Sequence, residues 1–307
     1  MDDTQGRVLL AGGTGFVGEA LRAAVRAAGY TVRLLVRSSA AARRYQAQGY
    51  ETELGDVQDP QSLYIAMEDV DAVINLVALI VESGDATFER VNFQGTVNLV
   101  NAARQASVDR MLQMSALGAG NRPEFRYHYT KWRAETYVQD HIANWTIVRP
   151  SIVFGPSAEG HFQFVTQLAD LVRNAPLIPV PGKGDARFQP IHVDDVAGVF
   201  SAALGDEGTR GKVLEIAGPE ILTYREMLAA VADELAVRKP MVNVPIPLIR
   251  MGAWVMDLLP LLEPPVTNEQ LKMLQIDNTT AHNAAPELLG RPLRSLRGNL
   301  DFLRNAR

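Results

Sequence analysis

The chain has 307 residues, 47% of them hydrophobic and 21% charged, which is typical of a folded globular protein with one large domain or two modest ones. Its net charge of −5, with no long run of one sign, argues against a nucleic-acid-binding surface. The absence of cysteine excludes thiol catalysis, disulfides and cysteine-ligated metal, and because the start MDDTQG lacks the features of a signal peptide, we expect a cytoplasmic protein.

The first predicted strand, residues 7–11, runs directly into a glycine-rich loop and a helix over 16–28. A strand, a glycine loop and a helix in this order suit a dinucleotide pyrophosphate, because the glycines permit a tight turn and bring backbone N–H groups close to the phosphates. An ordinary tight turn is the alternative. We predict that the dinucleotide is bound by Gly12, Thr14, Gly15, Phe16, Val17 and Gly18.

The second predicted strand, residues 31–36, ends in Arg37 and Ser38. An NAD-type site places an acidic residue here for the ribose 2′-hydroxyl, but no Asp or Glu lies between Glu19 and Glu51. The Arg37 guanidinium can instead pair with a 2′-phosphate, with Ser38 adding a hydroxyl, so we predict NADP(H). The alternative is that Arg37 is merely a solvated residue at the end of a strand.

Further along, apolar strands alternate with helical stretches, which predicts right-handed βαβ units and a doubly wound parallel sheet. Asp56 follows the third strand and is placed to bind the adenine amine, unless it only caps a turn. The remaining strands are expected at 50–54, 72–76, 111–115, 146–149 and 212–217. The remaining helices of this part are expected at 40–48, 60–67, 88–105 and 127–141.

Tyr127 and Lys131 lie four residues apart at the start of the helix predicted over 127–141, so their side chains share one face. This pair suits hydride transfer to or from a carbonyl. The Lys131 ammonium binds the nicotinamide ribose and favours the tyrosinate, while Tyr127 exchanges a proton with the substrate oxygen. A surface Tyr–Lys pair with no chemical role is the alternative.

After Pro150 the chain changes character, and we expect a smaller, mainly helical domain. The nucleotide-binding domain is predicted over residues 1–150 with 186–217 returning to it, and the small domain over 151–185 and 218–307. Capping boxes at Thr223-x-x-Glu226 and Thr267-x-x-Gln270 predict two helix starts. The apolar stretch 244–262 carries an arginine, an aspartate and prolines, so we expect it to lie in the small domain's core, in a cleft, or against a membrane or partner, and not to span a bilayer.

Several motifs together resemble the extended or atypical short-chain dehydrogenase/reductases. Within that superfamily the chain is similar to bacterial relatives of the nucleotide-binding accessory subunit of respiratory complex I and to proteins linked to ubiquinone biosynthesis. The resemblance implies a tightly held NADPH, with Val57, Ala78 and Pro150 added to its site and Ser115 as the hydroxyl that orients the carbonyl. The motifs are Gly12–Gly18, Gly55-Asp56, Asn75, Ser115, Tyr127-x-x-x-Lys131 and Arg149-Pro150-Ser151.

The sequence departs from the catalytic members of that superfamily at Leu117, where a second hydroxyl is expected. Thr130 or Tyr129 are candidate substitutes. The first hypothesis is therefore an NADP(H)-dependent oxidoreductase acting on an apolar carbonyl or a quinone, with no metal and no nucleic acid involved. The second is a non-catalytic, NADPH-loaded accessory or assembly subunit of a membrane-associated respiratory or quinone-synthesis complex, peripheral at the inner face of the membrane. A nucleotide-sugar epimerase or dehydratase, with Arg149 and Arg187 binding a diphosphate, is a third.

Overall fold

The computed structural model describes residues 5–161, 163–249 and 268–305 and divides the chain into two compact units. Residues 186–192, expected with the nucleotide-binding part, lie in unit 2, and residues 282–292 join unit 1. Residues 282–292 join unit 1 because the Ala284 N–H donates to the Glu215 carbonyl at 2.9 Å and the Arg291 guanidinium pairs with buried Asp195 at 2.7 Å. Unit 1 comprises Met1–Pro150, Val193–Ile216 and His282–Pro292, and unit 2 comprises Ser151–His192, Ala217–Ala281 and Leu293–Arg307.

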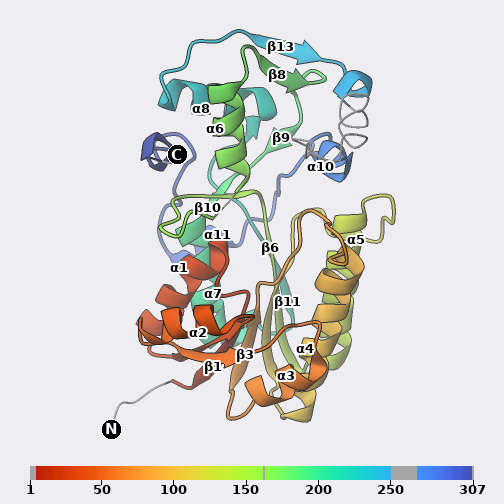
Figure 1. Cartoon of the computed structure of the whole chain (residues 1–307), viewed down its shortest axis with the longest axis vertical. Helices are drawn as coiled ribbons and strands as arrows, with labels where there is room; N and C mark the ends of the chain where they lie inside the picture. Colours follow the sequence, from red (N-terminus) through yellow and green to blue (C-terminus); the bar gives the residue numbers. More distant parts are fainter. Residues whose placement is uncertain (1–4, 162, 250–267, 306–307) are drawn as a thin grey trace. The chain divides into compact units, whose positions relative to one another are not determined.

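Unit 1 contains a seven-stranded sheet in the order β11-β6-β5-β4-β1-β2-β3, with every neighbouring pair parallel (Figure 1). The order reverses between β1 and β4, and in such sheets this switch point is where nucleotides bind. The predicted doubly wound parallel sheet is confirmed. The strands are β1 (Arg7–Ala11), β2 (Thr31–Val36), β3 (Glu51–Leu54), β4 (Ala72–Asn75), β5 (Arg110–Met114), β6 (Asn144–Pro150) and β11 (Lys212–Ile216).

The helices of unit 1 cover both faces of this sheet, with α1, α2 and α7 on one face and α3, α4 and α5 on the other (Figure 1). The helix predicted over 88–105 is divided into a π-helical turn, η1, and a regular helix, α4. The elements are α1 (Phe16–Ala27), α2 (Ser39–Gln46), α3 (Pro60–Ala66), η1 (Glu89–Gln94), α4 (Gly95–Gln105), α5 (Arg126–His141), α7 (Val193–Gly205), the 3-10 turn η2 (Glu207–Thr209) and α11 (Ala285–Leu289).

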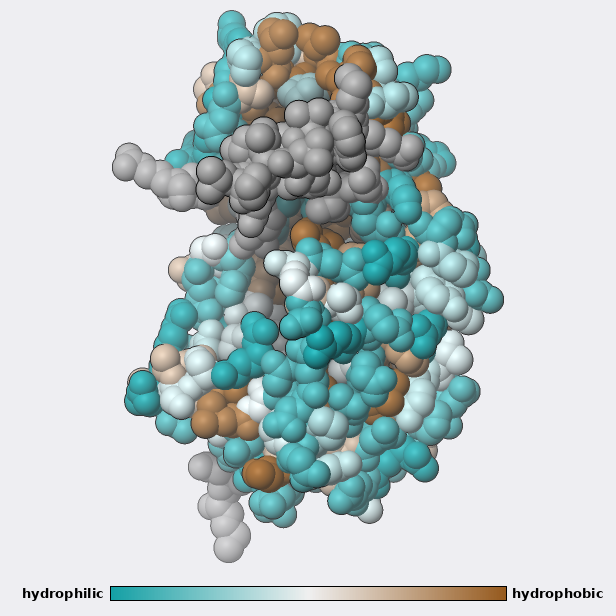
Figure 2. Space-filling view, turned by 45° about the vertical axis from the view of Figure 1, so that its right-hand side comes forward, coloured by the Kyte–Doolittle hydropathy of each residue, from teal (hydrophilic) through white to brown (hydrophobic). Residues whose placement is uncertain are grey.

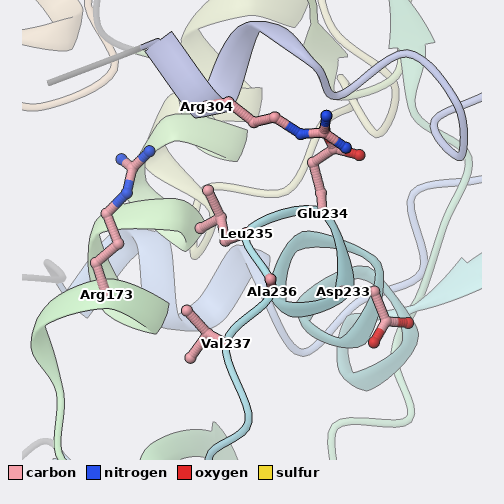
Figure 3. A pocket seen from close by; sticks show the side chains of 7 residues that line it. All are labelled: Arg173, Asp233, Glu234, Leu235, Ala236, Val237 and Arg304. Atoms are coloured by element: carbon pink, nitrogen blue, oxygen red, sulfur yellow. The ribbon is translucent and has the colours of Figure 1, made fainter.

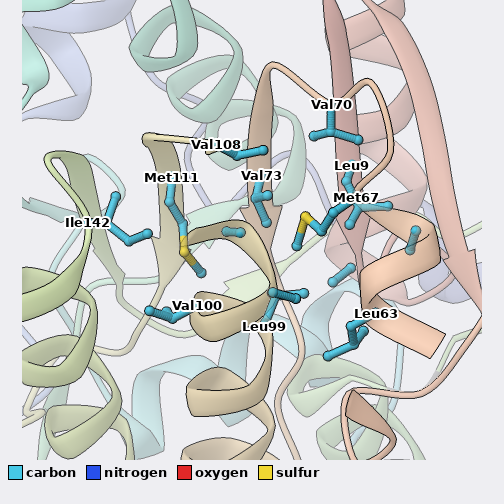
Figure 4. Packing of buried hydrophobic residues seen from close by; sticks show 14 of the residues in the cluster. Leu9, Leu63, Met67, Val70, Val73, Leu99, Val100, Val108, Met111 and Ile142 are labelled. Carbon is cyan, nitrogen blue, oxygen red and sulfur yellow. The ribbon is translucent and has the colours of Figure 1, made fainter. Parts of the chain in front are cut away.

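The core on the α3–α4–α5 face follows from the alternation of side chains along the strands. Leu9 and Ala11 of β1 point to this face, because successive strand residues point to opposite sides. They belong to one buried cluster with Leu63 of α3 and with Leu99 and Val100 of α4, of which Figure 4 labels all but Ala11. This buried layer holds the carboxyl ends of the strands, and the loops that follow them, in fixed positions.

In its described residues, unit 2 combines the expected helices with three two-stranded sheets around its own core. The predicted capping box that begins α8 is present, with Thr223 Oγ1 accepting from the Glu226 N–H at 3.2 Å and Glu226 accepting from the Thr223 N–H at 2.8 Å. The elements are β7 (Val153–Phe154), α6 (Phe164–Asn174), β8 (Ile178–Pro181), β9 (Arg187–Phe188), β10 (Ile191–His192), β12 (Leu222–Thr223), α8 (Tyr224–Glu234), β13 (Met241–Val244), α10 (Asn268–Met273) and α12 (Phe302–Asn305).

Among the described residues, no helix has the length and apolar character needed to cross a bilayer. Most of the apolar stretch 244–262, and Thr267 of the second predicted capping box, lie outside the described residues.

Candidate functional site

Two glycines bring the amino end of α1 against the end of β1. Gly12 has φ +82°, and a Cβ there would lie 3.0 Å from the backbone of Leu76 and Val77, which follow β4. A Cβ on Gly18 would lie 2.4 Å from the Gly12 carbonyl oxygen. A Cβ essentially never lies as close to backbone as the 2.4 Å at Gly18, and at Gly12 the positive φ adds to a tight contact, so the packing of this segment requires glycine at both positions.

Gly15 is different, because neither its backbone conformation nor any described residue requires a glycine there. Its φ is −95°, and a Cβ would meet only the Gly12 carbonyl oxygen at 3.5 Å, an ordinary contact. Gly15 is the N-cap of α1, and no side chain caps this end. The first-turn N–H groups, including those of Phe16 and Val17, therefore lack helical partners and form a half-buried donor surface beside Thr14. These residues fit a pyrophosphate, with Gly15 leaving room for it.

Arg37 and Ser38 follow β2, the neighbour of β1, and both are exposed. Within the described part of the chain, Arg37 forms no hydrogen bond or ion pair. Ser38 is the N-cap of α2, where its Oγ accepts from the Ala41 N–H at 3.2 Å, and its hydroxyl hydrogen remains available to donate. A free guanidinium beside a hydroxyl donor fits a phosphate.

Asp56 and Val57, at the end of β3, serve the fold at least in part. One Asp56 carboxylate oxygen accepts from the Gln58 N–H at 2.9 Å, the turn-capping role that the sequence left open. The Val57 side chain is buried in the core, where it packs against Gly95, and its carbonyl accepts from the Asn98 side chain at 2.8 Å. In the described part of the chain, the backbone N–H of Val57 and the second Asp56 carboxylate oxygen are left for a ligand.

A buried amide network supports the loop after β4, which carries exposed Ala78. Asn75 donates to Gln113 at 2.9 Å and to Thr96 at 3.2 Å, and it accepts from the Val77 N–H at 3.0 Å. Buried side-chain amides are stable only when they are bonded in this way, so the network fixes the position of the loop.

Tyr127, Lys131 and Ser115 are all buried, and all belong to unit 1. Lys131 is 1% exposed and Ser115 is 2% exposed, and neither the Lys131 Nζ nor the Ser115 Oγ has a hydrogen-bond partner among the described residues. Buried polar atoms without partners are rare in folded proteins. A ligand with hydroxyl and carbonyl oxygens, such as a nicotinamide ribose and a carbonyl substrate, would satisfy both.

Burial shifts the pKa values of the pair in opposite directions. It raises the pKa of the Tyr127 phenol to about 12, because the charged form is disfavoured away from water. It lowers the pKa of the Lys131 ammonium to about 8, with Glu135 opposing part of that effect. At neutral pH Tyr127 is therefore a proton donor and Lys131 is mostly charged.

The expected second hydroxyl is missing. Leu117 is buried, and its N–H donates to the Pro150 carbonyl at 2.9 Å. Leu117 and Pro150 therefore interact here through backbone atoms and add no side-chain hydroxyl. The Thr130 hydroxyl donates to the Tyr127 carbonyl at 2.9 Å, and the ring of Tyr129 stacks on Trp132. The Thr130 hydroxyl is thus occupied within its helix, whereas Ser115 is buried and its Oγ has no hydrogen-bond partner among the described residues.

The sequence reasoning did not identify a buried ion pair one turn after Lys131. Glu135, 2% exposed, accepts from Arg149 of β6 at 2.9 Å (Nε) and 2.6 Å (Nη2), and Arg149 also lies 3.7 Å from Glu215 of β11. The spacing of four residues on one helix face was the available signal. This bidentate pair joins α5 to the sheet and holds the helix that carries Tyr127 and Lys131.

Both arginines considered for a substrate diphosphate have carboxylate partners. Arg149 is paired with Glu135, and in unit 2 Arg187 donates to Asp277 at 2.8 Å (Nε) and 2.6 Å (Nη2). Neither guanidinium is free for a diphosphate without losing its partner.

Unit 2 contains a surface pocket that holds none of the predicted site residues (Figure 3). Apolar side chains line its middle, and Arg304 pairs with Glu234 across its rim at 2.7 Å. The lining residues are Arg173, Asp233, Glu234, Leu235, Ala236, Val237 and Arg304.

The chain was compared with known proteins. A family model described as "NAD dependent epimerase/dehydratase family" matches residues 8–217. The "NADH dehydrogenase [ubiquinone] 1 alpha subcomplex subunit 9, mitochondrial" of Arabidopsis thaliana is 28% identical over 89% of this chain and 70% of its own length. The "4-hydroxy-2-methyl-3-oxo-4-farnesyl-3,4-dihydroquinoline-1-oxide ketoreductase" of Stigmatella aurantiaca is 30% identical over 80% of this chain and 78% of its own. The solved structure of Thermus thermophilus UDP-glucose 4-epimerase with NAD shares the fold, with a TM-score of 0.69, 19% identity and 98% of each chain covered.

Proposed function

Because this chain belongs to the NAD dependent epimerase/dehydratase family, we propose that it binds NADP(H) and reduces an apolar carbonyl or quinone-like compound. The family resemblance predicted from the motifs is confirmed, and its relatives include both reductases and complex I subunits. The observation that carries the proposal is that Lys131 Nζ and Ser115 Oγ are buried without a partner among the described residues, together with the buried proton donor Tyr127.

The roles of these three side chains follow from their protonation. When bound, the reduced nicotinamide supplies a hydride to the carbonyl carbon. Tyr127 Oη gives its proton to the carbonyl oxygen, and Ser115 Oγ donates a hydrogen bond that orients that oxygen. The Lys131 ammonium binds the ribose hydroxyls and stabilises the tyrosinate by its charge.

The preference for NADP(H) over NAD(H) rests on the end of β2. Arg37 is exposed and unpaired among the described residues, Ser38 can donate its hydroxyl, and no carboxylate occupies the position that would repel a 2′-phosphate. The preference for an apolar acceptor draws on the Stigmatella relative, whose name describes a farnesylated quinoline as its substrate.

The test is a Tyr127→Phe variant. NADPH-loaded protein is mixed with a panel of quinones and apolar ketones, and the loss of nicotinamide absorbance is followed. We expect wild-type protein to oxidise NADPH with one of these classes and Tyr127→Phe to lose at least about a hundredfold in rate, while NADPH affinity changes little. Undiminished turnover by the variant would show that Tyr127 is not the acid.

A second candidate is a non-catalytic, NADPH-loaded subunit of a respiratory or quinone-synthesis complex at a membrane. Leu117, which leaves Ser115 without a second hydroxyl, and the Arabidopsis complex I relative favour it. Here the absorbance of tightly bound NADPH persists through the whole panel, and the protein co-purifies with a stoichiometric partner from membranes.

A further inference from the structure

The loop after β4 is held rigidly by the buried scaffold of unit 1. Asn92, fully buried in η1, accepts from the Leu79 N–H at 2.6 Å and donates to the Leu79 carbonyl at 3.0 Å. The Ser83 and Ala86 backbones exchange two hydrogen bonds, of 3.1 and 3.0 Å, and close a turn. The loop is thus fixed on both sides of Ile80 and Val81.

The same loop is joined to the start of α5, next to the proposed proton donor. Glu82 accepts from the Phe88 N–H at 2.9 Å and pairs with Arg126 at 2.7 Å. The Phe88 ring meets the Tyr127 ring edge-on, with centroids 5.8 Å apart. The loop therefore adjoins Tyr127 through contacts within unit 1.

Ile80 is 56% exposed and Val81 is 40% exposed in this fixed loop. Single exposed apolar residues are common, and on the face shown in Figure 2 hydrophilic side chains dominate while hydrophobic ones form separate patches. Ile80 and Val81 differ from such residues because they are adjacent and lie on a loop whose Glu82 accepts from the N–H of Phe88, the residue whose ring packs on Tyr127.

The charged groups of the loop do not favour an anionic substrate. The Glu82 carboxylate and the Arg126 guanidinium neutralise each other, so a phosphorylated substrate would have to break that pair. The exposed tip of the loop, Ser83 to Asp85, is polar and Asp85 pairs with Arg90 at 3.4 Å, so Ile80 and Val81 form its exposed branched aliphatic surface.

We infer that Ile80 and Val81 are specificity-determining residues that contact a hydrocarbon chain of the substrate whose oxygen Tyr127 protonates. This inference rests on the proposed function and deepens it. The loop selects carbonyl or quinone compounds that carry an aliphatic chain near the reacting group.

The test uses a homologous series of quinones or methyl ketones whose alkyl chain grows by one methylene at a time. For wild-type protein with NADPH we expect kcat/KM to rise with chain length, by up to about fourfold per methylene that becomes buried. The Ile80→Asn/Val81→Asn variant should flatten this slope. The matched control is Ile65→Asn on α3, an isoleucine of equal exposure (55%), which should keep the wild-type slope. A wild-type slope in the double variant would overturn the inference.

Calorimetric binding of the same series to NADPH-loaded protein separates this inference from the proposed function. If wild-type affinity rises with chain length, the double variant removes that rise, and no turnover is seen, the hydrocarbon-binding role of Ile80 and Val81 is supported and the reductase function is refuted. Turnover with an unchanged slope refutes the site alone, and the absence of both binding and turnover refutes both. If the double variant keeps the wild-type slope but is no longer retained on membranes, Ile80 and Val81 contact a partner and the inference is overturned.

Discussion

Alanine at Gly15, the N-cap of α1, and at Gly18, in its first turn, should separate stability from nucleotide binding. In Gly18→Ala the new methyl group would lie 2.4 Å from the Gly12 oxygen and 2.6 Å from the Gly13 backbone, which cannot move aside as a side chain can. Overpacking of this kind costs roughly 1–3 kcal/mol, and the rigid obstacle places it near the upper end. The helix propensity that alanine gains offsets about 1 kcal/mol of this. We expect a net loss of about 2 kcal/mol in the free energy of unfolding.

In Gly15→Ala the methyl group meets only an ordinary contact at 3.5 Å. The slightly poorer N-cap and the reduced freedom of the unfolded chain nearly cancel, so stability should change by less than about 1 kcal/mol. The methyl group would occupy the space proposed for the pyrophosphate, and the NADPH dissociation constant should rise by about tenfold or more.

The assays are thermal unfolding without nucleotide and NADPH fluorescence titration. For a domain of 150–250 residues, 2 kcal/mol corresponds to a fall of about 4–8 °C in Tm, expected for Gly18→Ala and not for Gly15→Ala. Wild-type NADPH affinity in a folded Gly15→Ala protein would refute the assignment of this loop. An unchanged Tm in Gly18→Ala would refute the packing argument.

Three further predictions concern charged residues. Arg37→Ser should weaken NADPH binding by about 10–100-fold and leave NADH binding unchanged. The control Arg104→Ser, at an exposed arginine on α4, should change neither affinity, and an equal loss of NADPH and NADH affinity in Arg37→Ser would exclude a 2′-phosphate contact. NADPH affinity should fall as pH rises through the Lys131 pKa of about 8, because the ammonium that binds the ribose is lost. The free energy of unfolding of the nucleotide-free protein should instead rise between about pH 8 and 10.5, because in that range only the unfolded chain keeps this proton. Parallel titrations of Lys131→Met should show neither pH dependence. Arg149→Gln leaves the Glu135 carboxylate buried without its partner and should lower the free energy of unfolding, measured by urea titration, by about 3 kcal/mol. The double variant Arg149→Gln/Glu135→Leu should regain most of that loss, and equal stability of the single and double variants would contradict this.

The sequence located the elements of unit 1 closely because each left a local signal. The strand at 7–11 and the start of the helix at Phe16 were placed correctly from apolar patterning and the glycines between them. The capping box at Thr223 and Glu226 marked the start of α8 for the same reason, since its hydrogen bonds join residues three apart. The π-helical turn at Glu89–Gln94 left no such signal, because its residues also suit an α-helix.

The long-range partners could not be predicted, because burial and ion pairing depend on which elements the tertiary fold brings together. The four-residue spacing showed that Tyr127 and Lys131 share a helix face, but not that both are buried with their pKa values moved in opposite directions. Likewise the sequence alone made Arg149 a candidate for binding a diphosphate, whereas the structure packs β6 beside α5 and pairs Arg149 with Glu135.

By itself, then, the sequence determined the doubly wound sheet and the glycine loop, because these depend on short-range patterns of apolar residues and glycine, and its motifs carried the resemblance to the family. The tertiary structure alone decided which polar atoms are left without partners. Lys131 Nζ and Ser115 Oγ come from different elements, and only the packing of α5 against the sheet removes both from water and leaves them for a ligand.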